Sequence, residues 1–256
     1  MRDFFQVVKG KNFGFVDFFA KNMYIYGMKN ELLLIGSLLL CYGSVLLLYK
    51  LLKETGLYVW TVIATIAANI EVLILINAFG LDQTLGNILF ASTFLVSDIL
   101  NESYGKKAAN KAVFIGCLTS VLFIVLSQYW LQYIPSQDDF AMPAMKSIFS
   151  NTPRVMIAGL VGYAVSQFFD VWIYQKWWNL TEKISGNRKA LLWVRNNGST
   201  LISQLINTLV FTFGAFYSVF DMPTLISICG TTYIIYTIAS LADTPFVYIA
   251  RKMEKA

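Results

Sequence analysis

The sequence predicts an all-α integral membrane protein, a polytopic helical bundle that crosses the membrane several times. Residues of the set AVILMFWYC make up 57% of the 256 positions and charged residues only 14%, against roughly 25% charged residues in a soluble domain. So few polar side chains cannot cover a water-exposed surface, and most of the surface must therefore face lipid. The apolar runs do not alternate apolar and polar residues as barrel strands do, so the spans are expected to be helices.

The same counts exclude several kinds of site. The three cysteines lie within apolar runs without ligand spacing, and the chain has no histidine, so we expect neither a disulfide framework nor an imidazole ligand or base. Motifs for phosphate, zinc or a nucleophile are also absent from the sequence. We therefore expect no metal, no cofactor and no catalytic residue. The net charge of +5 is attributed to cytoplasmic loops rather than to a nucleic-acid partner.

Residues 1–30 form the first predicted element, an interfacial amphipathic segment. Its aromatic residues are interspersed with five basic residues, which is typical of helices that lie in the membrane surface. It lacks the short apolar core and small-residue cleavage site of a signal peptide. Residues 31–49 follow as an extra N-terminal transmembrane helix, because this long apolar run carries no charge after Glu31.

The rest of the chain, residues 57–252, is predicted to be a six-helix core. A helix needs about 20 mostly apolar residues to cross the hydrocarbon region. Runs close to this length are found at residues 57–79, 84–102, 112–134, 154–176, 198–220 and 225–249.

The basic residues fall mainly in alternate connections. Thirteen of the twenty Lys and Arg lie in or beside residues 50–56, 103–111, 176–197 and the C-terminal tail, whereas the other three connections carry two. The positive-inside rule therefore places the C-terminus in the cytoplasm, and with seven spans the N-terminus lies outside. The five basic residues of the N-terminal segment then lie outside as well, against the rule.

Ionisable and amide side chains at membrane depth form the candidate binding site. Each charged group there costs about 2.5–3.5 kcal/mol, so it should face a partner or a wet cavity. Asp98 and Glu102 share one helix face, and Arg154 is the cation expected near the acids. We therefore expect a polar cavity between helices. The candidates are Asn69, Glu71, Asp98, Glu102, Arg154, Gln167, Asp170, Thr200, Gln204, Asn207 and Asp243.

Two other interpretations remain open. Amide and hydroxyl side chains commonly bridge helices without any further role, and Glu102 with Lys106 is consistent with an ordinary pair at the membrane boundary. Alternatively, Asp98 and Asp170 could form the acid dyad of an intramembrane enzyme. Against this, neither residue sits in a Gly-x-Gly-Asp setting.

Four long motifs resemble the queuosine precursor transporter family, also called the vitamin uptake transporter family. Their order along the chain is that of the family, and the positions of Asn69 and Gly86 match as well. The family core has six spans, which leaves residues 31–49 as an added helix. The motifs are STFLVSDILNESYGKKAANKAV (92–113), PRVMIAGLVGYAVSQFFDVWIYQKWW (153–178), LWVRNNGSTLISQLINTLVFTFGAF (192–216) and SLADTPFVYIARK (240–252).

This resemblance implies import across the cell inner membrane of 7-deazaguanine bases for queuosine modification of tRNA. Examples are 7-cyano-7-deazaguanine, 7-aminomethyl-7-deazaguanine and queuine. A guanine-like edge offers adjacent N–H donors, which a carboxylate of Asp98, Glu102 or Asp170 can accept. The amides can bind O6 and ring nitrogens, while Phe94 can stack on the ring.

Several properties of such a transporter stay open at this stage. The chain could act alone as a proton-coupled carrier through its carboxylates, or as the substrate-binding subunit of an ATP-driven importer, and it could form a homodimer. Two positions depart from the family pattern: Asn207 and Tyr236 stand where many members carry Asp and Lys. If the Asp and the Lys form an ion pair in such members, this chain has an uncharged Asn/Tyr contact in its place.

Overall fold

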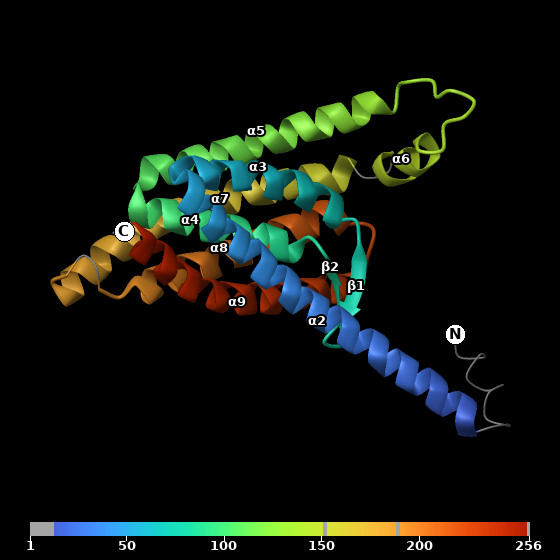
Figure 1. The fold of residues 1–256 in the computed structure, drawn as a ribbon, viewed down its shortest axis with the longest axis horizontal. Coiled ribbons are helices and arrows are strands. Elements are labelled where there is room, and N and C mark those ends of the chain that lie inside the picture. Colours follow the sequence, from blue (N-terminus) through green and yellow to red (C-terminus); the bar gives the residue numbers. More distant parts are fainter. Residues whose placement is uncertain (1–12, 151–152, 188–189, 255–256) are drawn as a thin grey trace.

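The computed structural model describes residues 13–150, 153–187 and 190–254, and this part of the chain forms a helical bundle with one β-hairpin (Figure 1). The predicted all-α membrane bundle is thus confirmed apart from the hairpin. The elements are α2 (Phe13–Leu52), α3 (Glu54–Glu71), β1 (Leu75–Ala78), β2 (Leu81–Thr84), α4 (Asn87–Ser103), α5 (Lys106–Trp130), α6 (Met142–Phe149), α7 (Pro153–Ser185), α8 (Leu192–Phe216) and α9 (Met222–Met253).

Five helices within the described residues are long and apolar enough to cross a membrane. They are α5, α7, α8, α9 and the Lys29–Leu52 part of α2. Leucine, valine and aromatic side chains stand exposed along α2 and α5, as expected for surfaces that face lipid instead of water. The protein is therefore a multi-pass membrane protein. Helices α3 and α4 fall outside this group of five, so the structure does not establish seven separate spans.

Helix α2 continues through the boundary that the sequence suggested near residue 30. It runs unbroken from Phe13 to Leu52, and its N-terminal part extends beyond the bundle (Figure 1). At this level, Asn30 donates to the backbone oxygen of Asn77 at 2.9 Å, and Glu31 accepts from the backbone N–H of Phe79 at 3.0 Å. The start of the predicted extra helix thus holds the β-hairpin. The predicted surface location of residues 1–30 stays a prediction, and residues 1–12 lie outside the described residues.

The predicted helix over residues 57–79 is too long. Helix α3 ends at Glu71, and β1 and β2 then pair antiparallel across a turn in which Phe79 and Gly80 both have positive φ, 55° and 72°. Such φ values at both central residues are those of a tight hairpin turn matched to strand twist. Hydropathy misses this change because a short apolar run looks the same in a buried helix and in a strand.

Helix α4 lies at the centre of the bundle. Fourteen of its 17 residues are buried, and it contacts α2, α3, α5, α7 and α9. A helix surrounded by other helices does not need an apolar surface toward lipid, so α4 can carry Ser92, Thr93, Ser97, Asp98 and Asn101 along its length. Its polar residues therefore face neighbouring helices.

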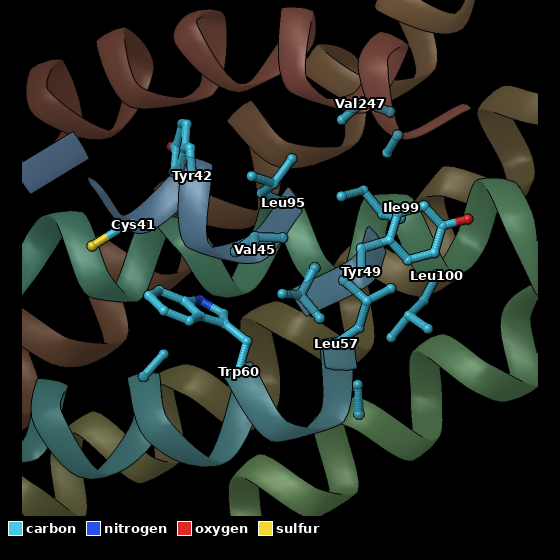
Figure 2. Close-up of a cluster of buried hydrophobic side chains, with 14 of the residues drawn as sticks. Cys41, Tyr42, Val45, Tyr49, Leu57, Trp60, Leu95, Ile99, Leu100 and Val247 are labelled. Carbon is cyan, nitrogen blue, oxygen red and sulfur yellow. The ribbon is translucent and has the colours of Figure 1, made fainter. Parts of the chain in front are cut away.

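The apolar core lies where α2, α3, α4 and α9 meet (Figure 2). Tyr42 and Tyr49 of α2 are fully buried there beside Leu57 of α3 and Leu95 of α4. The Tyr42 hydroxyl donates to the backbone oxygen of Ala239 at 3.1 Å. Helix α2 thus has an apolar face toward lipid and a second face that is part of the core.

Helices α7 and α8 approach closely because small residues lie between them. A Cβ added at Gly162 would stand 2.7 Å from Oδ1 of Asn207, and one at Gly214 would stand 3.1 Å from Cβ of Ala158. Small residues allow such close contact between membrane helices, where packing is a main source of association. Gly162 thereby permits the Asn207 side chain to lie against α7.

We expect Gly162→Ala to destabilise the protein, because the new methyl group overlaps Asn207. Overpacking of this kind costs about 1–3 kcal/mol, of which the better helix propensity of Ala offsets about 1 kcal/mol; the net loss should lower the thermal unfolding midpoint of the detergent-solubilised protein. Gly159→Ala is the matched control one turn away, since its added Cβ would meet its nearest atom only at 4.0 Å. It should leave the midpoint unchanged or raise it, because Ala is the better helix former by about 1 kcal/mol. Equal midpoints for the two variants would contradict this account.

Candidate functional site

A cavity with a mainly apolar lining and a few polar groups lies between the six helices α3, α4, α5, α7, α8 and α9. Its volume is about 70 Å³, which holds a few water molecules but falls short of the ~300–1,000 Å³ typical of sites that enclose an organic ligand. Two predicted residues, Asn69 and Asn207, line it. The other polar lining groups are Thr65, Thr84, Asn87, Thr93, Ser120, Tyr163 and Tyr236.

The cavity combines amide groups with aromatic rings. Asn69 donates to the backbone oxygen of Thr65 at 2.8 Å and to the hydroxyl of Ser120 at 3.2 Å, which links α3 to α5. Nδ2 of Asn87 and Oγ1 of Thr65 have no hydrogen-bond partner among the described residues. Phe90 lies between the rings of Phe94, Tyr163 and Tyr236, with ring centroids 5.5–6.0 Å apart. The cavity therefore offers hydrogen bonds and aromatic surface together.

Two glutamines lie next to the cavity, on α7 and α8, on the side that faces the C-terminal half of α4. Gln167 of α7 donates to the Thr93 hydroxyl at 2.8 Å, and its Oε1 has no partner within the described chain. Gln204 of α8 is fully buried, and neither end of its amide finds a partner there. A buried amide without hydrogen bonds costs about 1–3 kcal/mol. Native structures keep few such groups, and those that they keep call for an explanation.

Three buried carboxylates lie about one helical turn further from the cavity than the two glutamines. Asp98 of α4, Asp170 of α7 and Asp243 of α9 are at most 1% exposed and lie close enough to interact electrostatically. Thr200 donates to Oδ2 of Asp98 at 3.1 Å, and Asn196 donates to Oδ1 of Asp243 at 2.8 Å. We call Asp98, Asp170 and Asp243 the carboxylate cluster.

Most oxygens of the carboxylate cluster are unpaired. Oδ1 of Asp98, Oδ2 of Asp243 and both oxygens of Asp170 lack a hydrogen-bond partner in the described part of the chain. A buried carboxylate is normally paired, hydrogen-bonded or bound to a metal. Four unpaired acceptor atoms in one buried layer thus mark a place built to receive donors or cations.

Glu102 lies beyond this cluster and has its own partners. Arg195 of α8 binds it with two donors, Nη2 to Oε1 at 2.7 Å and Nε to Oε2 at 3.0 Å. The Tyr174 hydroxyl donates to Oε2 at 3.0 Å, and Arg251 lies 3.6 Å from Oε1. The Glu102–Lys106 alternative was therefore wrong, because Lys106 is exposed while Arg195 is fully buried and bidentate. Glu102 joins four helices at this end of the bundle.

Three other candidates lie apart from the carboxylate cluster. Arg154 donates to the backbone oxygens of Gly214 and Tyr217 at the end of α8, at 3.0 and 2.5 Å, so it is not the cation next to the acids. Glu71 is the last residue of α3 and is half-buried. Phe94 is fully buried behind Phe90, which reaches the cavity itself.

Sequence reasoning missed several residues of this region. Arg195 was counted among the basic residues of a loop, although it begins the polar stripe of α8 that continues through Ser199 and Ser203. Asn196 and Thr93 were also overlooked as partners of Asp243 and Gln167. The four-residue spacing of polar positions in α8 was the signal that could have found Arg195.

Comparisons with known proteins identify the family of this chain. A sequence model of the family described as "Putative vitamin uptake transporter" matches residues 84–250. The chain is 37% identical over 209 residues to the "Probable queuosine precursor transporter" of Bacillus subtilis (strain 168), which covers 82% of this chain and 89% of the relative. The chain belongs to the vitamin uptake transporter family. The family resemblance found in the four motifs is thus confirmed.

A second relative is more distant. The "Queuosine precursor transporter" of Escherichia coli (strain K12) is 25% identical over 171 residues, or 66% of this chain and 70% of the relative. No solved structure matches the chain. Both relatives are named as transporters, so this member of the family is a membrane transporter and not an enzyme. Neither name supports the alternative in which Asp98 and Asp170 form the acid dyad of an intramembrane enzyme.

The two positions that depart from the family pattern lie together in this transporter. Tyr236 of α9 and Asn207 of α8 both line the cavity, and their side chains interact. Neither carries a charge, so α8 and α9 are connected at this level by a neutral contact.

Proposed function

We propose that this chain imports queuosine precursors, namely 7-deazaguanine bases such as 7-cyano-7-deazaguanine, 7-aminomethyl-7-deazaguanine or queuine. The observation that carries the proposal is the row of unpaired buried groups from the cavity to the carboxylate cluster. A deazaguanine presents adjacent N–H donors and an O6 acceptor on one planar ring, which complements unpaired carboxylates and amides. The names of the two relatives point to the same substrates.

Asp98 is the carboxylate that we assign to the guanine-like edge. It lies on the central helix α4, and its Oδ1 has no partner among the described residues. Gln167 and Gln204 lie between Asp98 and the cavity. The unpaired Nε2 of Gln204 can donate to O6 or to a ring nitrogen, and the unpaired Oε1 atoms of both glutamines can accept from N–H groups of the base. Phe90 replaces Phe94 as the stacking residue, because Phe90 lines the cavity. Stacking of a base on an aromatic ring contributes about 1–3 kcal/mol.

Transport requires the helices to separate, because the cavity of about 70 Å³ is too small for the base. The cavity lies at the end of the bundle that holds the β-hairpin and the last turns of α8. Glu102 and Arg195 lie at the other end, beside Arg251 near the C-terminus of the chain. The predicted topology has six core spans, the added helix at residues 31–49 and a cytoplasmic C-terminus. In this orientation the cavity opens to the outside, and the Glu102–Arg195 ion pair closes the cytoplasmic end. Whether the transporter forms a homodimer, and whether protons or ATP drive it, are separate predictions that this proposal does not need.

The proposal is tested in bacteria that can neither make queuosine precursors nor import them. Expression of this chain should restore queuosine in tRNA when 7-cyano-7-deazaguanine, 7-aminomethyl-7-deazaguanine or queuine is supplied, as measured by mass spectrometry of digested tRNA. Competition among the three bases for labelled uptake then ranks the substrates. Unmodified tRNA despite folded protein in the membrane would refute the proposal.

A further inference from the structure

Asp170 has surroundings that recognition of a guanine-like edge does not explain. Its side chain is fully buried on α7, and both of its oxygens lack a hydrogen-bond donor in the described chain. Three serine hydroxyls interact with it, Ser97 from α4 and Ser199 and Ser203 from α8, although none of them meets both the distance and the angle of a full hydrogen bond to either carboxylate oxygen. Five side-chain oxygens from three helices thus gather in one buried place.

Each of the three serines also has a backbone carbonyl of its own helix within hydrogen-bond distance. Ser97 donates to the backbone oxygen of Phe94 at 2.9 Å, Ser199 to that of Asn196 at 3.1 Å, and Ser203 to that of Ser199 at 2.9 Å. A hydroxyl has one proton and two lone pairs. When that proton is donated to the backbone carbonyl, the lone pairs of the serine oxygen face Asp170, and lone pairs facing a carboxylate repel one another unless a positive ion lies between them.

The neighbouring negative charges also favour a cation at Asp170. Asp98 and Asp243 lie close enough to Asp170 to interact electrostatically, so the negative potential at Asp170 is further increased. Arg195, the buried cation of this region, is engaged by Glu102. An all-oxygen group with this potential is complementary to a hard cation, which prefers oxygen ligands.

We propose that Asp170, Ser97, Ser199 and Ser203 form a binding site for a monovalent metal cation, Na⁺, between α4, α7 and α8. One carboxylate with three neutral hydroxyls suits a single positive charge. Within the described residues no three His, Cys, Asp or Glu side chains are arranged to hold a metal ion together, which disfavours a divalent ion held by several carboxylates. A proton would need only one or two of these oxygens.

The site offers a way to couple the ion to transport, and this part rests on the proposed function. Na⁺ would draw α4, α7 and α8 together beside Asp98, and would offset the charge of Asp170 next to the carboxylate that we assign to the base. Coupling-ion sites of secondary transporters lie in this way beside the substrate site, near the middle of the membrane.

The site itself is tested without any substrate. Thermal unfolding of the purified full-length protein in detergent is followed as NaCl replaces choline chloride at constant ionic strength and pH, with KCl as a parallel series. A ligand that binds only the folded state raises the midpoint in a saturable way. We expect such a rise with Na⁺ and a smaller one with K⁺. No difference between Na⁺ and choline would overturn the proposal.

Single serine variants locate the site. Ser199→Ala, Ser203→Ala and Ser97→Ala should each raise the half-maximal Na⁺ concentration by about tenfold or more, as for groups that complete a metal site, and Asp170→Asn should remove the Na⁺ effect. Ser127→Ala is the matched control, because Ser127 is equally buried on α5 and donates to the backbone oxygen of Ile124 at 2.9 Å. Equal responses of Ser127→Ala and Ser199→Ala would contradict the site.

A pH series separates Na⁺ from protons. Without Na⁺, acidification should not reproduce the saturable rise; if it does, and Na⁺ adds nothing, the group binds a proton and the Na⁺ proposal fails. Uptake driven by a Na⁺ gradient in proteoliposomes is measured separately. Na⁺ stabilisation without uptake of 7-deazaguanine bases would refute the proposed substrates and leave the cation site intact.

Discussion

In the Asp98→Asn variant, uptake of 7-deazaguanine bases is expected to fall by about ten- to one-hundred-fold while the folded protein persists. The reason is that the variant loses a hydrogen bond to a charged acceptor, which contributes about 1.5–3 kcal/mol. Asparagine has the same shape and can still accept from Thr200, as Oδ2 of Asp98 does at 3.1 Å. Initial rates of labelled uptake, divided by the amount of folded transporter, provide the measurement.

Stability distinguishes this loss from simple misfolding. Asp98→Asn removes one of three neighbouring buried charges, so the thermal midpoint should stay equal or rise, because repulsion inside the carboxylate cluster decreases. Asp138→Asn is the matched control, an exposed acid in the connection between α5 and α6, and should transport normally. Full uptake by Asp98→Asn would exclude this carboxylate as the ligand of the base.

Arg195→Ala is expected to lower the free energy of unfolding by about 3–5 kcal/mol, the largest loss of stability that we predict. Removing one partner leaves a buried Glu102 without its main counter-charge, which is more costly than losing both partners. Arg195 also donates to the backbone oxygen of Ala190 at 2.7 Å and lies 4.6 Å from the ring centre of Trp178. Thermal midpoints and the yield of monodisperse protein after detergent extraction measure the effect.

The double variant Glu102→Gln with Arg195→Gln isolates the ion pair. It should recover part of the stability that Arg195→Gln loses alone, because no charge is then left unpaired, and the coupling appears as non-additivity. Lys106→Ala is the matched control for the pair suggested by sequence spacing, and should change stability by less than about 0.5 kcal/mol, as for other exposed positions. Additive effects of Glu102→Gln and Arg195→Gln would contradict a direct pair.

Much of the architecture follows from the sequence because lipid imposes simple requirements. The composition predicted a helical membrane protein, and the long runs of α5, α7, α8 and α9 were recognised, with ends that differ from the observed helix ends by one to nine residues. Thr200, Gln204 and Asn207, which the sequence suggested as binding-site residues, all lie on the buried face of α8. These features depend on residue type and spacing along a single helix, which the sequence shows directly.

The β-hairpin at Leu75–Thr84 shows where this reasoning ends. Residues 72–79 are apolar enough to continue α3, and only the turn at Phe79 and Gly80 with pairing to β2 makes them a strand. The contacts that hold the hairpin, from Asn30 and Glu31, come from residues about 47 positions away. Pairing partners of this kind are not visible in local hydropathy.

Composition and motifs were enough to show that lipid is the main solvent, that the chain resembles a family of membrane transporters, and that a few acids lie inside the bundle. Which of those acids are already paired became visible only in the folded bundle. Glu102 pairs with Arg195, 93 positions away, instead of with Lys106, four positions away, whereas Asp98, Asp170 and Asp243 keep oxygens without a partner among the residues that the structure describes. The physical reason is that a buried charge is stabilised by whichever partner the packing of separate helices brings within reach, and spacing along one helix does not contain that information.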